Sequence, residues 1–397
     1  MNITDKTSFI ENNIEKFKPE YQEWFSENAS KHYSYVYPDR EYTDKDAEKV
    51  ANWANSLEDA GMIGLIKDNR ISFETAHKTA LEFNQVQLKA EYKERTGLDA
   101  KTVYDDGSAW IENKNSKSQT TFYLKNSEDK KVATVQYYPN QNRIYDLATK
   151  DTSPENKGQI TDLFNQLPPN LVVEVGPFKD NRLDLSKGVG VNIPDNSTFK
   201  CTVWANGSDL LELNSVNADR IEAGGSKLSK VHNCKIDWFN ISGTKVERIT
   251  NYSKIKSLIA DRTPLDAIEC GKSFDALHLE GCKNIDNESF PSGLRVKRLN
   301  VSGTNVTELP GKTYEALVVG GDAMEKLPSG LNVGILDIGK GSKITSIPKS
   351  VNVEKTIYIS QDTEMSDAQK EKVSSISTQF IKSYGELEQK QTSGMRM

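Results

Sequence analysis

The stretch LRVKRLNVSGTNVTELP, residues 294–310, decides the expected fold, because its spacing of apolar residues recurs along the second half of the chain. Leu299 and Val301 lie two residues apart, and Val306 and Leu309 follow them. Two apolar residues at this spacing point to the same side of an extended strand. The stretch therefore predicts a strand with one buried side, followed by a turn and a second buried segment.

Ten apolar pairs of this kind occur in one register. The pairs are Leu183/Leu185, Val203/Ala205, Ile221/Ala223, Phe239/Ile241, Leu258/Ala260, Leu277/Leu279, Leu299/Val301, Leu317/Val319, Leu336/Ile338 and Ile357/Ile359. The steps between their second members are 20, 18, 18, 19, 19, 22, 18, 19 and 21 residues. A period of this length indicates stacked coils that bury a continuous apolar wall, since one coil alone cannot bury its own apolar side.

Further columns follow the pairs. Apolar residues come about five residues later at Leu210, Leu228, Val246, Leu265, Val306, Met324 and Ile344, and about eight residues later at Leu213, Val231, Ile249, Ile268, Leu309, Leu327 and Ile347. A polar residue or cysteine lies three residues after the pair at Ser208, Ser226, Thr244, Thr263, Cys282, Thr304, Asp322 and Asp362, and glycine precedes it at Gly207, Gly225, Gly243, Gly281, Gly303 and Gly321. We expect tight turns at these glycines, and hydrogen bonds from the polar side chains to the backbone of the neighbouring coil.

This frame resembles the leucine-rich-repeat family at the short end of its period. The resemblance implies a solenoid of about ten coils whose ends need caps. Residues 167–175 and the helix before them are expected to cover the first coil, and a helix over residues 366–389 is expected to cover the last.

The first half of the chain has other periods. Residues 8–18, 43–61 and 71–97 predict helices, the last running from Ser72 to Gly97 with Phe73, Ala76, Ala80, Phe83, Val86 and Leu88 on or near one face. Residues 99–150 alternate apolar and polar residues and predict three or four antiparallel strands, followed by a short helix capped by Ser153.

We therefore expect a multidomain α+β protein in four parts. They are a helical domain at 1–98, a small β-rich element with a linking helix at 99–166, a leucine-rich-repeat solenoid at 167–362, and a capping helix with tail at 363–397.

The β-rich part also shows a resemblance. Asp106, Gly107 and Trp110, followed by TFYLKNSEDKKVATVQ at residues 121–136, resemble a segment of the PcfJ-like family of phage and mobile-element proteins. The stretch between these matches contains neither the His nor the Cys of that family's central motif, so the resemblance implies a degenerate remnant. A PcfJ-like segment beside such repeats is similar to proteins of large tailed phages and implies a phage or prophage origin.

Composition narrows the classes of partner. The net charge is −6, which argues against a general nucleic-acid binder. The four cysteines have no zinc-site spacing and are expected to be buried, reduced thiols. No signal pattern and no long apolar run occurs, so we expect a soluble protein in the cytoplasm of an infected bacterial host, with no membrane partner. The oligomeric state stays open.

The sequence contains no recognisable catalytic or metal-binding pattern. The four histidines are scattered, GKGSK at residues 339–343 does not fit a phosphate-binding loop, and no nucleophile-elbow pattern occurs. We expect no catalytic residues, no metal ligands and no cofactor, and hence no enzyme.

The middle residue of each pair should face outward along the strands. The most favourable combination of such residues and their neighbours for a protein-binding hot spot is Trp204, Arg220, Glu222, Trp238, Asn240 and His278. The alternative is that a neighbouring domain or a cap covers both tryptophans.

These expectations favour a non-enzymatic protein that binds a protein partner, such as a host defence factor, through the solenoid and the N-terminal helices. The first alternative is a structural component of a phage virion. The second is an enzyme with its site in residues 1–150, and a bacterial leucine-rich-repeat effector is disfavoured because no ligase-type cysteine domain is present.

Overall fold

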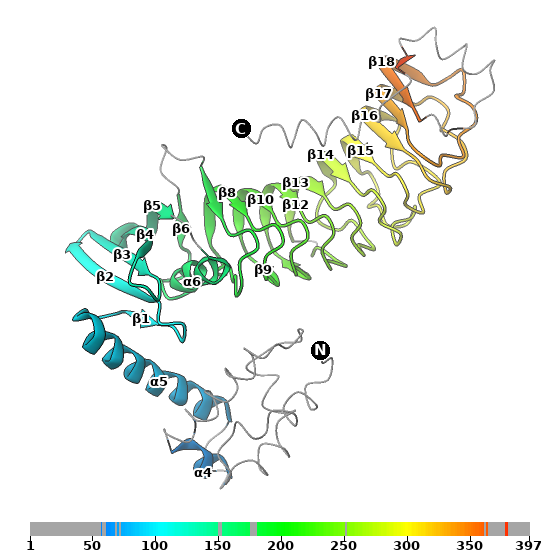
Figure 1. Cartoon of the computed structure of the whole chain (residues 1–397). Coiled ribbons are helices and arrows are strands. Elements are labelled where there is room, and N and C mark those ends of the chain that lie inside the picture. The colour runs from blue at the N-terminus through cyan, green and yellow to red at the C-terminus, as the bar shows by residue number, and fades with distance from the viewer. Residues whose placement is uncertain are drawn as a thin grey trace. The chain divides into compact units, whose positions relative to one another are not determined.

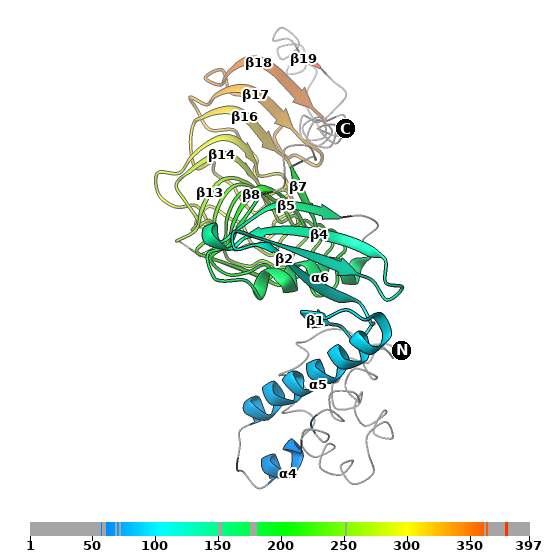
Figure 2. The same ribbon diagram turned by 90° about the vertical axis from the view of Figure 1, so that its left-hand side faces the viewer.

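The computed structural model of the chain describes residues 57, 61–67, 70, 73–149, 153–174, 181–250, 252–360, 363 and 378–379 (Figures 1 and 2). By its internal contacts the chain divides into two compact units. One comprises residues 1–111 with 127–129, and the other comprises residues 112–126 with 130–397.

The first unit contains two described helices and the beginning of a sheet. Its elements are α4 (Met62–Lys67), α5 (Phe73–Thr96), β1 (Thr102–Val103) and the start of β2 (Ala109–Ser116). Helix α5 confirms the helix expected between Ser72 and Gly97. It ends at Thr96, and Gly97 follows with a φ of 74°, which few other residues adopt, and donates its N–H to the carbonyl of Lys93 at 2.7 Å.

The face expected on α5 is only partly buried. Phe83 and Val86 are exposed by 37% and 67%, whereas Tyr92, on the last turns, is buried with Val103 and Ala109. The helix expected over residues 8–18 lies outside the described residues, as does nearly all of the one expected over residues 43–61.

The second unit begins with the antiparallel strands that the sequence predicts. They are the rest of β2, then β3 (Gln119–Lys125), β4 (Lys131–Tyr138) and β5 (Arg143–Thr149), with the short 3₁₀ helix η2 (Pro139–Gln141) between β4 and β5. Phe122, Val135 and Leu147 are aligned across β3, β4 and β5 and are all buried, so one face of this sheet forms a core.

This sheet continues into the solenoid without a break. Strand β5 pairs in parallel with β6 (Val172–Val173), and β6 pairs in parallel with β8 (Thr198–Trp204). Strand β7 (Arg182–Asp184) pairs with a later part of the same strand β8. Strands β6 and β7 therefore lie end to end as two pieces of one position in the sheet, at the start of the coils.

The solenoid confirms the expected coil register. Ten parallel strands succeed one another along the array, and nine connections join them (Figure 1). The strands are β7, β8, β10 (Asn217–Glu222), β12 (Lys235–Asn240), β13 (Lys254–Ile259), β14 (Ser273–His278), β15 (Arg295–Asn300), β16 (Thr313–Val319), β17 (Asn332–Ile338) and β18 (Asn352–Ile359). Both members of all ten predicted pairs are buried. In the connection after β14, where no apolar residue follows at the expected spacing of five, Ile285 is fully buried in its place.

The turns after the strands also follow the expectation. All six glycines expected at these turns have positive φ, and Lys187, Arg262 and Gly341 adopt the same conformation in other coils. The turn backbones bond from coil to coil, as in the N–H of Gly225, which donates to the carbonyl of Ser242 at 2.8 Å. A second, short parallel pair that the sequence did not predict, β9 (Glu212–Asn214) with β11 (Lys230–His232), lies on the far side of two coils.

The polar residues at the turns bond differently from the expectation. The hydroxyl of Thr244 donates to the carbonyl of Ile241 in its own coil at 2.7 Å, and Ser208, Ser226, Thr263 and Thr304 do the same with the residue three positions earlier. The expected bond to a neighbouring coil is wrong for these five hydroxyls, because the tight turn brings each one over its own strand end. Only for Cys282 do the described residues show a bond to the preceding coil, from the thiol to the carbonyl of Ala260 at 3.0 Å.

Helix α6 (Pro154–Asn165) covers the first coil, as expected. Ser153 and Asn156 form a reciprocal capping box at its start. Gly158 lies so close to the first coil that an added Cβ would be 2.0 Å from the carbonyl oxygen of Val189, so only glycine permits this approach.

The other expected cap differs where it is described. Thr378 and Gln379 form strand β19, which pairs in parallel with β18, so a helix that runs through these two residues is wrong. The pairing partner supplied by β18 favours extended backbone there. The rest of residues 366–389 and Asp362 lie outside the described residues.

Candidate functional site

The strand face of the first coils gathers most of the residues singled out by the sequence. Register aligns Trp204 with Glu222 and Glu222 with Asn240 on β8, β10 and β12, and aligns Arg220 with Trp238. His278 is separated from this group, because Ile259 on β13 lies between it and Asn240. The structure therefore brings together five of the six residues and places the sixth two strands away, about 10 Å along the sheet.

Two arginine–tryptophan pairs define this surface. The guanidinium carbon of Arg182 lies 4.5 Å from the ring centroid of Trp204, and that of Arg220 lies 5.0 Å from the ring centroid of Trp238. Stacking of this kind holds both partners in place. We call Arg182, Trp204, Arg220, Glu222, Trp238 and Asn240 the Arg–Trp surface.

Arg182 is the member that sequence reasoning missed. It occupies the position before the first apolar pair, in the same column as Arg220, and this column was the available signal. Its stacking on Trp204 joins residues from β7 and β8, which lie 22 positions apart in the sequence (204 − 182), so the sequence did not show the contact.

Glu222 is the buried centre of the surface. It accepts hydrogen bonds from Nε of Arg220 at 2.8 Å and from the side-chain amide of Asn240 at 2.9 Å, and it is only 8% exposed. The expectation that Glu222 faces solvent is therefore wrong, since its two neighbours lie against it. Asn240 in turn accepts the N–H of Ser242 at 3.0 Å, which fixes the amide at the end of β12.

Both tryptophans are partly exposed. Neither is fully covered, and the Nε1 of Trp238 is buried without a hydrogen-bond acceptor among the described residues. A large aromatic side chain that is half open and held by a stacked arginine is the kind of residue that dominates protein interfaces.

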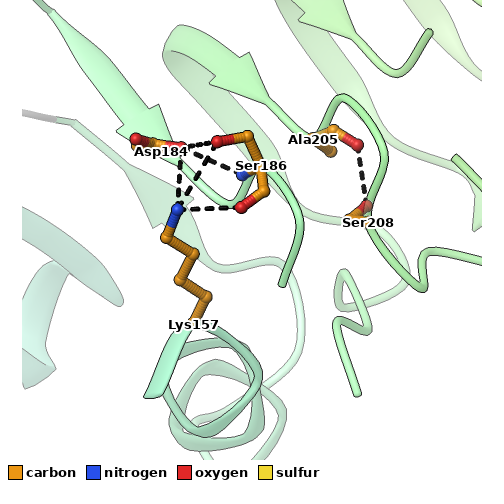
Figure 3. Close-up of polar contacts among 5 residues, drawn as sticks. All are labelled: Lys157, Asp184, Ser186, Ala205 and Ser208. Atoms are coloured by element: carbon orange, nitrogen blue, oxygen red, sulfur yellow. Dashed lines mark hydrogen bonds and ion pairs between the residues drawn. The ribbon is translucent and has the colours of Figure 1, made fainter. Parts of the chain in front are cut away.

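In the first coil, hydrogen bonds and an ion pair hold the carboxylate of Asp184 in place beside the Arg–Trp surface. Figure 3 shows Lys157 of α6 reaching Asp184 at 3.3 Å and the carbonyl of Ser186 at 2.8 Å, while Ser186 donates to Asp184 through its N–H and its hydroxyl. Burial alone would raise the pKa of Asp184, but the hydrogen bonds of Ser186 and the charge of Lys157 outweigh it and lower that pKa. Asp184 is thus held as a carboxylate by α6 and its own turn.

A second carboxylate is shared near the start of β8. Glu174 forms ion pairs with Arg143 of β5 and, at 3.1 Å, with Lys200 of β8. Its side chain is 19% exposed, whereas that of Lys200 is 53% exposed. Burial would raise the pKa of Glu174, but the hydrogen bonds of Arg143 and Lys200 hold it below its usual value.

The later coils present a different strand face. The middle residues Asn300, Val318 and Asp337 are 2%, 6% and 1% exposed. The expectation that these three residues lie open to solvent is wrong, whereas His278 and Tyr358 in the same column are partly exposed.

The residues on which the expected PcfJ-like resemblance rests lie in a turn and in the strand after it. Gly107 has a φ of 80° in the turn before β2, Asp106 accepts the N–H of Ser108 at 2.9 Å, and Trp110 is fully buried. Asp106 and Gly107 thus form the turn that precedes β2, and Trp110 anchors that strand; Asp106 itself is exposed.

The described residues do not meet the requirements of a reactive thiol, a metal site or a membrane-spanning helix. The four cysteines are free and buried, and burial raises the pKa of Cys201 to about 12 and that of Cys234 to about 11, which disfavours the reactive thiolate. Within the described ranges, no group of three His, Cys, Asp or Glu residues could hold a metal ion. None of the helices described is long and apolar enough to span a bilayer.

Comparison with known protein families, curated proteins and solved structures finds no match to this chain.

Proposed function

We propose that the chain is a leucine-rich-repeat protein without catalytic activity that binds a protein partner through the Arg–Trp surface. The carrying observation is the pair of stacked arginine–tryptophan contacts, Arg182 on Trp204 and Arg220 on Trp238, on neighbouring strands of one rigid sheet. Preorganised aromatic and arginine side chains lose little conformational entropy on binding, and they are the residues most enriched in interface hot spots.

The repeat columns support the leucine-rich-repeat assignment, since the apolar pair, the turn glycine and the small polar residue recur in the frame of that family. The resemblance of Asp106, Gly107 and Trp110 to PcfJ-like proteins supports a phage-encoded protein acting in the bacterial cytoplasm. A host protein, for example a defence factor, is then the proposed partner, and the helical N-terminal domain is proposed to add to the contact.

The proposal is tested by capture of the partner from a lysate of the native or infected host. The tagged wild-type chain should retain a stoichiometric protein, and Trp204→Ala with Trp238→Ala should weaken its binding by about 700-fold or more, since two hot-spot residues contribute roughly 2 kcal/mol or more each. Tyr252→Ala is the matched control, because Tyr252 is an aromatic residue exposed by 78% in a loop outside the Arg–Trp surface.

Retention of the partner by the double variant would contradict binding through the Arg–Trp surface. The binding site would then lie in another part of the chain, such as the N-terminal half. Recovery of the protein in purified virus particles, with no captured partner, would favour the structural-component alternative. Activity retained by residues 1–150 alone would favour an enzyme.

A further inference from the structure

Around Thr202, at the centre of the Arg–Trp surface, the positively charged side chains are more exposed than the carboxylates that pair with them. Thr202 is aligned with Arg182 on β7 and with Arg220 on β10, so the two arginines flank it on neighbouring strands. Lys200 lies two positions earlier on the same side of β8. Three cations therefore surround one strand position, with the two arginine backbones about 10 Å apart.

The carboxylates that balance these cations lie beneath them. The Glu222 side chain is 11% exposed under Arg220, which is 36% exposed, and Glu174 is 19% exposed under Lys200, which is 53% exposed. Arg182 is exposed and forms no ion pair with any described residue, because Asp184 on its own strand is bound by Lys157 and Ser186. The outward charge of this face is therefore positive, although the chain as a whole carries −6.

Two exposed carboxylates lie on this face: Asp184, whose side chain is 41% exposed, is balanced by Lys157 at 3.3 Å, and Asp219 opposes the positive charge. Asp219 lies next to Arg220, at the point where the register between β8 and β10 shifts, and it is exposed. Asp237 further along is paired with Lys256 at 2.7 Å, so that pair adds no net charge. Asp219 is thus the natural place to change the net charge without touching a stacked or buried group.

We infer that the partner bound by the Arg–Trp surface presents an acidic polypeptide segment, whose carboxylates meet Arg182, Lys200 and Arg220 while an apolar side chain contacts Trp204 and Trp238. This inference rests on the proposed function and names the chemistry of its partner. Arg182 forms no ion pair with any described residue, and Arg220, which binds Glu222 through Nε and Nη2, keeps its other terminal nitrogen for a partner. Planar guanidinium groups suit the binding of carboxylates. Complementary charge of this kind also speeds the encounter of the two proteins.

The test uses the full chain and a dye-labelled peptide of ten glutamates as the probe, followed by fluorescence anisotropy at low and at raised salt. Wild type should bind this probe, and Arg182→Gln with Lys200→Gln should weaken binding by about thirtyfold, since each lost charge contact contributes roughly 1 kcal/mol. Asp219→Asn should strengthen binding about twofold, because it removes a repelling charge. A ten-lysine peptide should not bind.

Lys297→Gln is the matched control. Lys297 is a 60% exposed lysine paired with Asp275 on β14 and β15, so its loss should leave probe binding unchanged. Tryptophan emission of each variant, compared with wild type, verifies that the fold is retained.

Absence of probe binding, or equal binding by wild type and the Arg182/Lys200 variant, would overturn the acidic-segment inference. A ten-residue deoxythymidine strand that binds more than tenfold tighter than the peptide would also overturn it, in favour of a nucleic acid. The proposed function would still stand in those cases if the Trp204/Trp238 variant loses its captured protein, so the two failures are distinguishable.

Discussion

Each coil has a strand side and a turn side, and the two are stabilised by different kinds of interaction. On the strand side, Leu, Ile, Val, Phe and Ala all occupy the same inward columns, because burial of apolar area does not depend on direction. On the turn side, the columns hold mostly glycine, serine and threonine, since positive φ and short hydrogen bonds depend on geometry. The comparison suggests that the strand side supplies most of the stability and the turn side fixes the register.

The largest expected effect is on the strand side. Phe239 of β12 is fully buried, so Phe239→Ala should lower the free energy of unfolding by about 4 kcal/mol through lost burial and a cavity. Phe239→Leu should lower it by only about 1 kcal/mol, because it keeps most of the volume. Urea unfolding of the full chain measures both. A loss below about 1 kcal/mol for the alanine variant would show that the strand side is not the main source of stability.

The next effect concerns a carboxyl group on the turn side. Asp261 is 5% exposed, and burial, together with the charge of Glu280, raises its pKa to about 6 despite the hydrogen bond from the N–H of Glu280. The folded protein therefore holds this proton more tightly than the unfolded chain does. The contribution of Asp261 to stability is present below pH 4 and is lost as the pH rises through about 6.

Asp261→Asn should accordingly raise the free energy of unfolding at pH 7.5 by about 2 kcal/mol and should flatten its dependence on pH between 4 and 6. Thermal unfolding at pH 5 and at pH 7.5, for wild type and variant, measures this. Equal destabilisation of the variant at both pH values would instead mean that the charged carboxylate is needed to anchor the turn.

The smallest expected effect is that of a single turn hydroxyl. Thr244→Val keeps the shape of the side chain but removes the bond to the carbonyl of Ile241, and should lower the free energy of unfolding by about 1 kcal/mol. Thr313→Val, at an exposed position at the start of β16, is the control and should change it by less than about 0.5 kcal/mol. Urea unfolding measures both variants. Equal changes in the free energy of unfolding would mean that the turn hydroxyls do not stabilise the coils.

The sequence predicted the strand side well and the turn side in part. The inward pairs recur every 18 to 22 residues, and periodicity of apolar residues is the signal that burial imposes on a sequence. The glycines were predicted because positive φ restricts residue type. The acceptors of Ser208 and Thr244 were predicted wrongly, since two carbonyls within reach of one hydroxyl are distinguished only by the path of the turn.

The candidate surface shows the same limit. The residues of the Arg–Trp surface were named from their columns, but the burial of Glu222 was not predicted, because it depends on the rotamers of Arg220 and Asn240. The stacking of Arg182 on Trp204 was missed for a related reason: a contact across two strands has no local signature. His278 was included because it occupies the same column as Trp204, Glu222 and Asn240. It lies two strands beyond Asn240, so it is separated from the Arg–Trp surface.

The parallel pairing of β5 with β6 has a consequence for self-association. A stack of parallel strands normally ends in a row of open backbone groups that can template pairing with another chain. Here β5 takes up those groups along β6, with Arg143 aligned to Val172 and Ile144 aligned to Val173. That part of the end is thereby protected against fibre-like, end-to-end polymerisation of identical copies.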